Sequence, residues 1–104
     1  MIKKYELAKE TVTYKNGVML YRIRALHDIY EGCCLTIKKG TLGGWIQDED
    51  NLAQDGTCWV GSDAIVMESA CVRDSAHVGG SAVCSGTAHI YGRARVCGDV
   101  VVRG

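Results

Sequence analysis

Small and apolar residues return every six positions through the second half of the chain. The first position of each unit is small or apolar, and the third is Val, Ile or Cys everywhere except at Gln54. Alternate residues of a β-strand lie on the same face, so both positions are expected to point inward from a short strand. From Leu52 onward the units read LAQDGT, CWVGSD, AIVMES, ACVRDS, AHVGGS, AVCSGT, AHIYGR, ARVCGD and VVVRG.

The fifth and sixth positions of these units predict a bend after each strand. Glycine, serine or an acidic residue stands fifth, and a small polar residue follows in most units. Glycine tolerates the positive φ of tight bends, while the β-branched valines favour an extended backbone. One strand and one bend, repeated without interruption, predict a parallel β-solenoid over residues 52–104 with Val72 and Val78 facing inward.

This spacing resembles the hexapeptide-repeat proteins, which form left-handed parallel β-helices. The residues that carry the resemblance are Val66-x-x-x-Ala70, Val72-x-x-x-Ala76 and Val78-x-x-x-Ala82. The resemblance implies an all-β triangular prism with three units, about 18 residues, in each coil. Residues 52–104 would then form just under three coils.

A second resemblance covers nearly the whole chain. It is to a bacterial and phage family of transferase-like hexapeptide-repeat proteins, the YdcK-like family, in which a short N-terminal β segment precedes the repeats. This chain departs from the family in its short array and in serines or arginines at positions where the family often has asparagine. The matching motifs are Arg22-Ile23-Arg24-Ala25-Leu26, Leu42-Gly43-Gly44-Trp45-Ile46, Asp50-Asn51-Leu52, Cys58-Trp59-Val60 and Ala94-Arg95-Val96-Cys97-Gly98-Asp99.

Residues 1–51 lack the repeat and are expected to cover the exposed strand edges at one end of the solenoid. Asn16-Gly17 between β-rich runs at 11–14 and 18–23 is a strong hairpin signal. A further strand is expected at 35–37, and Gly43-Gly44 is expected to form a tight bend before Trp45. We expect Trp45 and Trp59 to pack where this cap meets the first coil.

With about 18 residues per coil, outward side chains that far apart in sequence stack into ladders. The first ladder would contain Trp59, His77 and Arg95. The second would contain Cys71 and His89, with Asp55, Arg73 and Tyr91 beside them. The third would contain Ile65, Val83 and Val101, with Met67 alongside.

The third ladder predicts a homo-oligomer interface, because outward positions on a soluble face are usually polar. Ile65, Met67, Val83 and Val101 are therefore the expected interface residues. The edge of the last coil is a second candidate for pairing. Trp59, His77, Arg95, Arg73 and Tyr91 form a secondary surface.

Two histidines are candidates for chemistry. The resemblance to hexapeptide-repeat acyltransferases, many of which use a histidine as general base, makes His77 the candidate catalytic residue; alternatively, it is a surface histidine that covers Trp59. Cys71 beside His89 could form a thiol–imidazole dyad, but no third, orienting group is evident and the pairing could be a coincidence of the ladders. His27 is expected in a loop of the cap.

Charge and composition narrow the function further. The 104 residues carry 12 basic and 12 acidic side chains, which makes a nucleic-acid partner unexpected. There is no long apolar run for a membrane span and no visible secretory signal, so we expect a cytoplasmic protein. The six cysteines show no CxxC pairing and alternate in face, so they are expected to fill space rather than to bind metal or form disulfides. The acidic run 48–50 is expected to be a solvated turn.

Two classes of function remain open. The favoured hypothesis is a non-catalytic binding or scaffold protein of phage or prophage type, which associates with itself and with a protein partner and needs no cofactor; a host-directed counter-defence role is one version. The alternative is an acyl-coenzyme A-dependent acyltransferase. Against the alternative stand the lack of an inserted loop in the repeat and the rule that a fold alone does not establish a function.

Overall fold

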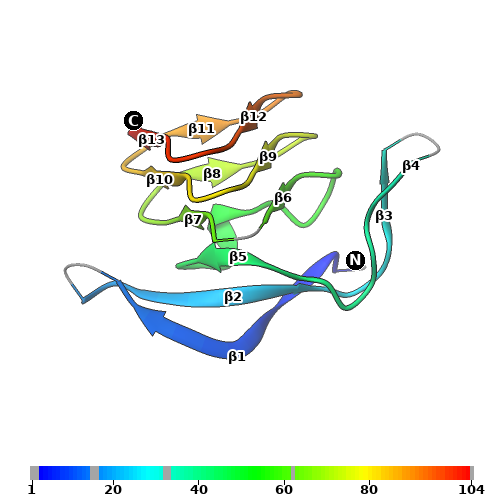
Figure 1. Ribbon diagram of the computed structural model, residues 1–104, viewed down its shortest axis with the longest axis horizontal. Helices are drawn as coiled ribbons and strands as arrows, with labels where there is room; N and C mark the ends of the chain where they lie inside the picture. Colours follow the sequence, from blue (N-terminus) through cyan, green and yellow to red (C-terminus); the bar gives the residue numbers. More distant parts are fainter. Residues whose placement is uncertain (1–2, 15–16, 32–33, 62, 104) are drawn as a thin grey trace.

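The structure is a computed structural model that describes residues 3–14, 17–31, 34–61 and 63–103. It is almost entirely β, with a stack of short strands over a base of longer ones (Figure 1). The base contains β1 (Tyr5–Thr13), β2 (Met19–Ala25), β3 (Ile29–Glu31), β4 (Cys34–Ile37), β5 (Leu42–Ile46) and the 3-10 helix η2 (Glu49–Asn51). The stack contains β6 (Trp59–Val60), β7 (Ile65–Val66), β8 (Cys71–Val72), β9 (His77–Val78), β10 (Val83–Ser85), β11 (His89–Ile90), β12 (Arg95–Val96) and β13 (Val101–Arg103).

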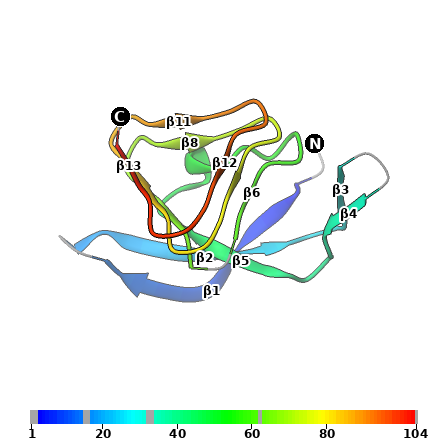
Figure 2. The same cartoon turned by 45° about the horizontal axis from the view of Figure 1, so that its top comes forward.

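The stacked strands pair in parallel at a constant offset. Val83 of β10 lies opposite Ile65 of β7 on one side and Val101 of β13 on the other, so each step is one coil of 18 residues. The same offset joins β6, β9 and β12, and also joins β8 and β11. Seen at an angle to the coil axis, successive turns overlie one another as triangles (Figure 2). The prediction of an all-β solenoid of about three coils is confirmed.

Small and branched residues fill the inside of the coils, as the repeat predicts. Val72 is fully buried and Val78 is 2 % exposed. The packed interior is continuous with Ile23 and Ile46 of the base, so one core extends through both halves of the chain. Its repeat members are Val60, Ala64, Val66, Ala70, Ala76, Ala82, Cys84, Ala88 and Ile90.

The bends use the left-handed region of φ, and two of them do so without glycine. Gly80 has φ of 63°, and a Cβ there would lie 2.6 Å from the backbone nitrogen of Gly98 in the next coil. Glu68 and Asp74 adopt φ of 61° and 62°, which is unfavourable for residues with a side chain. The Glu68 carboxylate accepts a hydrogen bond from a backbone N–H one coil away, and so does that of Asp74; these bonds offset the strain.

The base is joined to the solenoid through a single sheet. β1 pairs antiparallel with β2, β2 pairs antiparallel with β5, and β5 pairs in parallel with β7 of the first coil. The order β1-β2-β5-β7-β10-β13 thus makes six strands continuous from the base to the last coil. The expected hairpin and the expected strand at 35–37 are confirmed as β1–β2 and β4. Residues 15–16, including Asn16, and Cys33 lie outside the described residues.

The expected bend at Gly43-Gly44 is wrong, because both glycines lie inside strand β5. A Cβ on Gly43 would come 2.5 Å from the carbonyl oxygen of Val60, and one on Gly44 would come 2.5 Å from that of Ala64. Glycine is therefore required here for the close approach of β5 to the first coil rather than for a turn. No helix in the described part of the chain has the length and apolar character to cross a membrane.

Candidate functional site

The apolar ladder forms a column across the six-stranded sheet. Ile65 and Val83 are half-buried, while Val101 is 55 % exposed. Trp45 lies opposite Ile65 in the register of β5 and β7, and it extends the column toward the base. The Arg22 guanidinium lies 5.1 Å from the centre of the Trp45 ring, an arrangement that attracts the cation to the ring face.

The place of Trp45 in this column was missed by the sequence analysis. It precedes Ile65 by 20 residues, whereas the ladders of the repeat step by 18. The difference arises in the connection that contains η2, where the chain has not yet entered the regular repeat. As a result Trp45 and Trp59 pair in different sheets.

The face with His77 carries a groove of about 300 Å³. His77 lies between Trp59 and Arg95 in the ladder, as predicted. The glycines beside the ladder leave the groove floor without side chains, and none of the described residues that line it carries a carboxylate. The lining residues are Trp59, Gly61, His77, Val78, Gly79, Arg95, Val96 and Cys97.

Trp59 differs from the surface position expected for it. It is only 3 % exposed and belongs to the core that includes Ala25 and Ile29 of the base. A bulky aromatic ring at the first coil is packed into the junction with the cap, which buries more apolar area than an open face would. Little of the Trp59 ring is therefore available to a ligand, and His77 and Arg95 are its more accessible neighbours in the ladder.

The third face brings together Cys71 and His89, which lie opposite each other in β8 and β11. Burial raises the pKa of the Cys71 thiol, and the nearby Arg73 only partly opposes this. A raised pKa disfavours the thiolate that a nucleophilic cysteine needs, so the local physics argues against a thiol–imidazole dyad.

The predicted contact between Arg73 and Tyr91 is present on this face, with the guanidinium 5.2 Å from the ring centre. The expected ion pair of Arg73 with Asp55 is not among those formed by the described residues. The backbone carbonyl of Asp55 instead accepts a hydrogen bond from Lys4.

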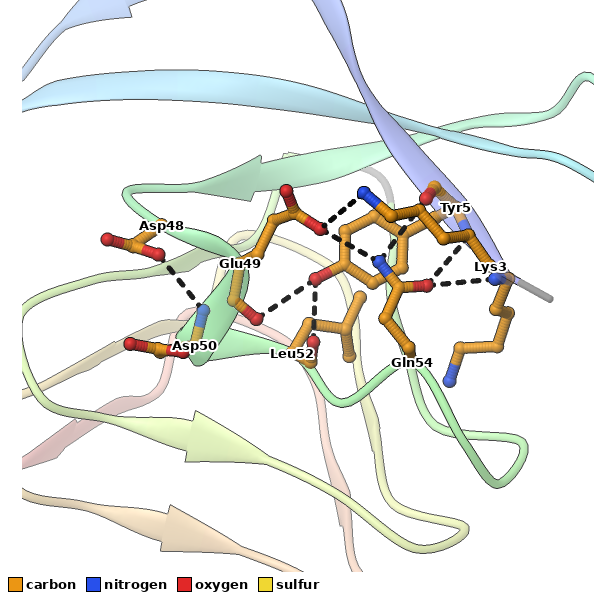
Figure 3. Close-up of polar contacts among 8 residues, drawn as sticks. Lys3, Tyr5, Asp48, Glu49, Asp50, Leu52 and Gln54 are labelled. Atoms are coloured by element: carbon orange, nitrogen blue, oxygen red, sulfur yellow. Dashed lines mark hydrogen bonds and ion pairs between the residues drawn. The ribbon is translucent and has the colours of Figure 1, made fainter. Parts of the chain in front are cut away.

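The junction of cap and first coil is held by side-chain hydrogen bonds (Figure 3). The buried Tyr5 hydroxyl donates to the Leu52 carbonyl at 2.6 Å and lies 3.1 Å from that of Glu49. The Gln54 amide oxygen accepts from the backbone N–H groups of Lys4 and Tyr5, and its nitrogen donates to the Tyr5 carbonyl. Gln54, the one exception among the third positions, thus pairs with the start of β1 as a backbone strand would.

Asn51 is the second polar residue at this junction, and it is 1 % exposed. Its amide nitrogen donates to the carbonyls of Ala70 at 2.7 Å and Glu68 at 3.1 Å. Its oxygen accepts from the backbone N–H groups of Gln47 and Asp48. The acidic run 48–50 forms the capped η2 turn around this residue, as expected of a turn.

The cysteines of the repeat differ in exposure from one to the next. Cys58 and Cys84 are buried, Cys71 is half-buried and Cys97 is exposed. All four are free thiols. Among the described residues, no group of three or more His, Cys, Asp and Glu is arranged to hold a metal ion.

Comparison with known proteins adds one relative and no family model. No protein-family model matches the chain. The chain is 35 % identical over 66 residues to the uncharacterized acetyltransferase YdcK of Escherichia coli (strain K12). The match covers 57 % of this chain but only 19 % of YdcK, so the chain corresponds to about a fifth of that protein. With its coils stacked in parallel, the chain is a hexapeptide-repeat β-solenoid that is similar in sequence to YdcK.

Proposed function

We propose that this protein is a non-catalytic scaffold that associates with a second copy of itself through the apolar column. The observation that carries the proposal is the unbroken run of Trp45, Ile65, Val83 and Val101 across four neighbouring strands. A contiguous apolar stripe is costly to leave in water, and such stripes mark interfaces.

The energetics favour the pairing of two such columns. Burying each branched side chain contributes about 1.5–3 kcal/mol before the costs of association are subtracted. Parallel strands hold the side chains in register, so the column requires little ordering when it pairs. The opposing face, with Arg73, Tyr91 and the exposed His89, is polar and has no comparable stripe.

The test is light scattering coupled to gel filtration over a range of protein concentrations. We expect an oligomer whose association constant falls at least tenfold in Val83→Lys. The matched control is His89→Lys, in the ladder of another face, which should associate like the wild type. A monomer at high concentration contradicts self-association, and an oligomer that is indifferent to Val83→Lys contradicts this surface.

A finer form of the proposal adds a protein partner, as expected for a phage-type accessory factor directed at a host. The groove beside His77 and Arg95 is the surface we assign to such a partner. The test is capture from a bacterial lysate with wild-type protein and with a His77→Ala/Arg95→Ala variant. A partner retained equally by both proteins would contradict this surface.

An acyl-coenzyme A-dependent acyltransferase is the second candidate, favoured by the similarity to YdcK and by the groove at His77. Against it stands the lack of a carboxylate among the described groove residues to orient the imidazole. Titration with acetyl-coenzyme A, followed by assay of free thiol release with amine and alcohol acceptors, distinguishes the two. Thiol release that is lost in His77→Ala would establish the enzyme and overturn the non-catalytic proposal.

A further inference from the structure

The junction of cap and first coil also holds a lysine buried against a cysteine. Lys4 is 2 % exposed and Cys58 is fully buried. The Lys4 Nζ lies 3.1 Å from the Cys58 Sγ, 2.7 Å from the Cys58 carbonyl oxygen and 3.3 Å from the Asp55 carbonyl oxygen. The printed contacts of this amine are therefore two uncharged carbonyls and a sulfur.

This environment favours an amine that can react. Taking an ammonium out of water is unfavourable unless a charge compensates it, and burial lowers the pKa of Lys4. A buried lysine that loses its proton more readily offers a free electron pair on nitrogen. The nearest soft atom to that pair is the Cys58 sulfur.

We propose that Lys4 and Cys58 form a peroxide-dependent covalent cross-link, a sulfenamide, that fastens the start of the cap to the first coil. A thiol oxidised to a sulfenic acid condenses with a nearby nitrogen in this way. Lys4 directly precedes β1 and Cys58 directly precedes β6. The bond would join residues 54 positions apart in the chain.

The chemistry is balanced with one molecule of hydrogen peroxide. The Cys58 sulfur attacks one peroxide oxygen, the O–O bond breaks, and the thiol proton leaves with the other oxygen as water. The Lys4 nitrogen then attacks the sulfur of the sulfenic acid, the S–O bond breaks, and the departing hydroxide takes a proton from nitrogen as a second water. A dithiol reductant reverses the reaction by cleaving the S–N bond and restoring the amine and the thiol.

Peptide mapping tests the proposal sharply. Cleavage after glutamate yields residues 1–6 as one peptide, which contains no cysteine, and residues 50–68 as another, in which Cys58 is the only cysteine. A species joining these two peptides therefore cannot be a disulfide. After peroxide treatment and blocking of free thiols, we expect this species, less two hydrogens, with fragment ions that place the bond on Lys4 rather than on Lys3. Dithiothreitol should remove it.

Three controls complete the experiment. Lys4→Arg and Cys58→Ser should abolish the joined species, whereas Cys84→Ser, at an equally buried cysteine, should retain it. Wild-type protein unfolded in urea before oxidation should give at least tenfold less, because the two residues meet only in the fold. Recovery of separate peptides from folded wild-type protein, with Cys58 unmodified or oxidised to sulfinic acid, would overturn the proposal.

Discussion

The solenoid and its junction with the cap are held together by different kinds of contact. In the solenoid, each coil repeats the same parallel backbone pairing and the same inward Ala and Val. At the junction, Asn51, Gln54 and Tyr5 each make contacts that occur once. A repeated contact can lose one copy and still leave neighbours in place, whereas a contact made once has no substitute. The junction should therefore be the more sensitive region to single polar substitutions.

The largest effect is expected from Asn51→Ala. The change removes the partner of several buried backbone groups, and each unsatisfied buried group costs about 1–3 kcal/mol. We expect the free energy of unfolding, measured by urea titration, to fall by about 3 kcal/mol or more. Asp50→Ala, at the exposed neighbour, should change it by less than about 0.5 kcal/mol. Equal effects would refute the special role of the junction.

The next largest effect is expected inside the solenoid, from Ala76→Leu. Ala76 is fully buried, and extra methylenes in a packed interior cost about 1–3 kcal/mol. The matched control is Ala94→Leu, at the same position of a later repeat, where the side chain is exposed. Urea unfolding should separate the two variants. A loss in Ala94→Leu as large as in Ala76→Leu would contradict the burial pattern.

These two variants also mark what could be predicted from the sequence. The inward position of Ala76 follows from the period of six, because a local rule repeated many times leaves little freedom in the answer. The role of Asn51 does not follow, since its partners Glu68 and Ala70 lie about one coil away and belong to no pattern. Gln54 left a usable signal, a polar residue at an apolar position, but its partner in β1 could not be derived from that signal.

The ladders show the same division within the candidate site. The stacking of Ile65, Val83 and Val101 follows from arithmetic, and the structure confirms it. The addition of Trp45 depends on the length of an irregular connection, and the burial of Trp59 depends on how the cap packs. Periodicity thus predicted the regular part of each face, and tertiary packing decided its end next to the cap.

A smaller effect at the junction is expected from Tyr5→Phe. The change removes the hydroxyl that donates to the Leu52 carbonyl and leaves that buried acceptor without it. We expect a loss of about 1–2 kcal/mol in the free energy of unfolding. Tyr30→Phe, at an exposed tyrosine, serves as the control and should match the wild type.

The same variant gives a pH test of this junction. Burial raises the pKa of Tyr5 above its ordinary value of 10.0, so the unfolded chain loses this proton at lower pH than the folded one. Stability from this group is complete below pH 10.0 and falls as the pH rises above it. We expect the stability of Tyr5→Phe to decline less steeply than that of the wild type above this pH. Parallel declines would contradict a buried, protonated Tyr5 hydroxyl.

The smallest effect is expected on the open face of the solenoid, from Tyr91→Leu. Tyr91 is 57 % exposed, and its ring interacts with the Arg73 guanidinium across water-accessible space. Cation–π contacts at such sites are worth about 0.5–1 kcal/mol, and leucine retains part of the apolar cover. We therefore expect a loss of about 0.5 kcal/mol, and the double variant with Arg73→Ala should lose less than the sum of the single variants. A loss comparable to that of Asn51→Ala would mean that exposed ladders stabilise the solenoid as strongly as the contacts of the junction stabilise the cap.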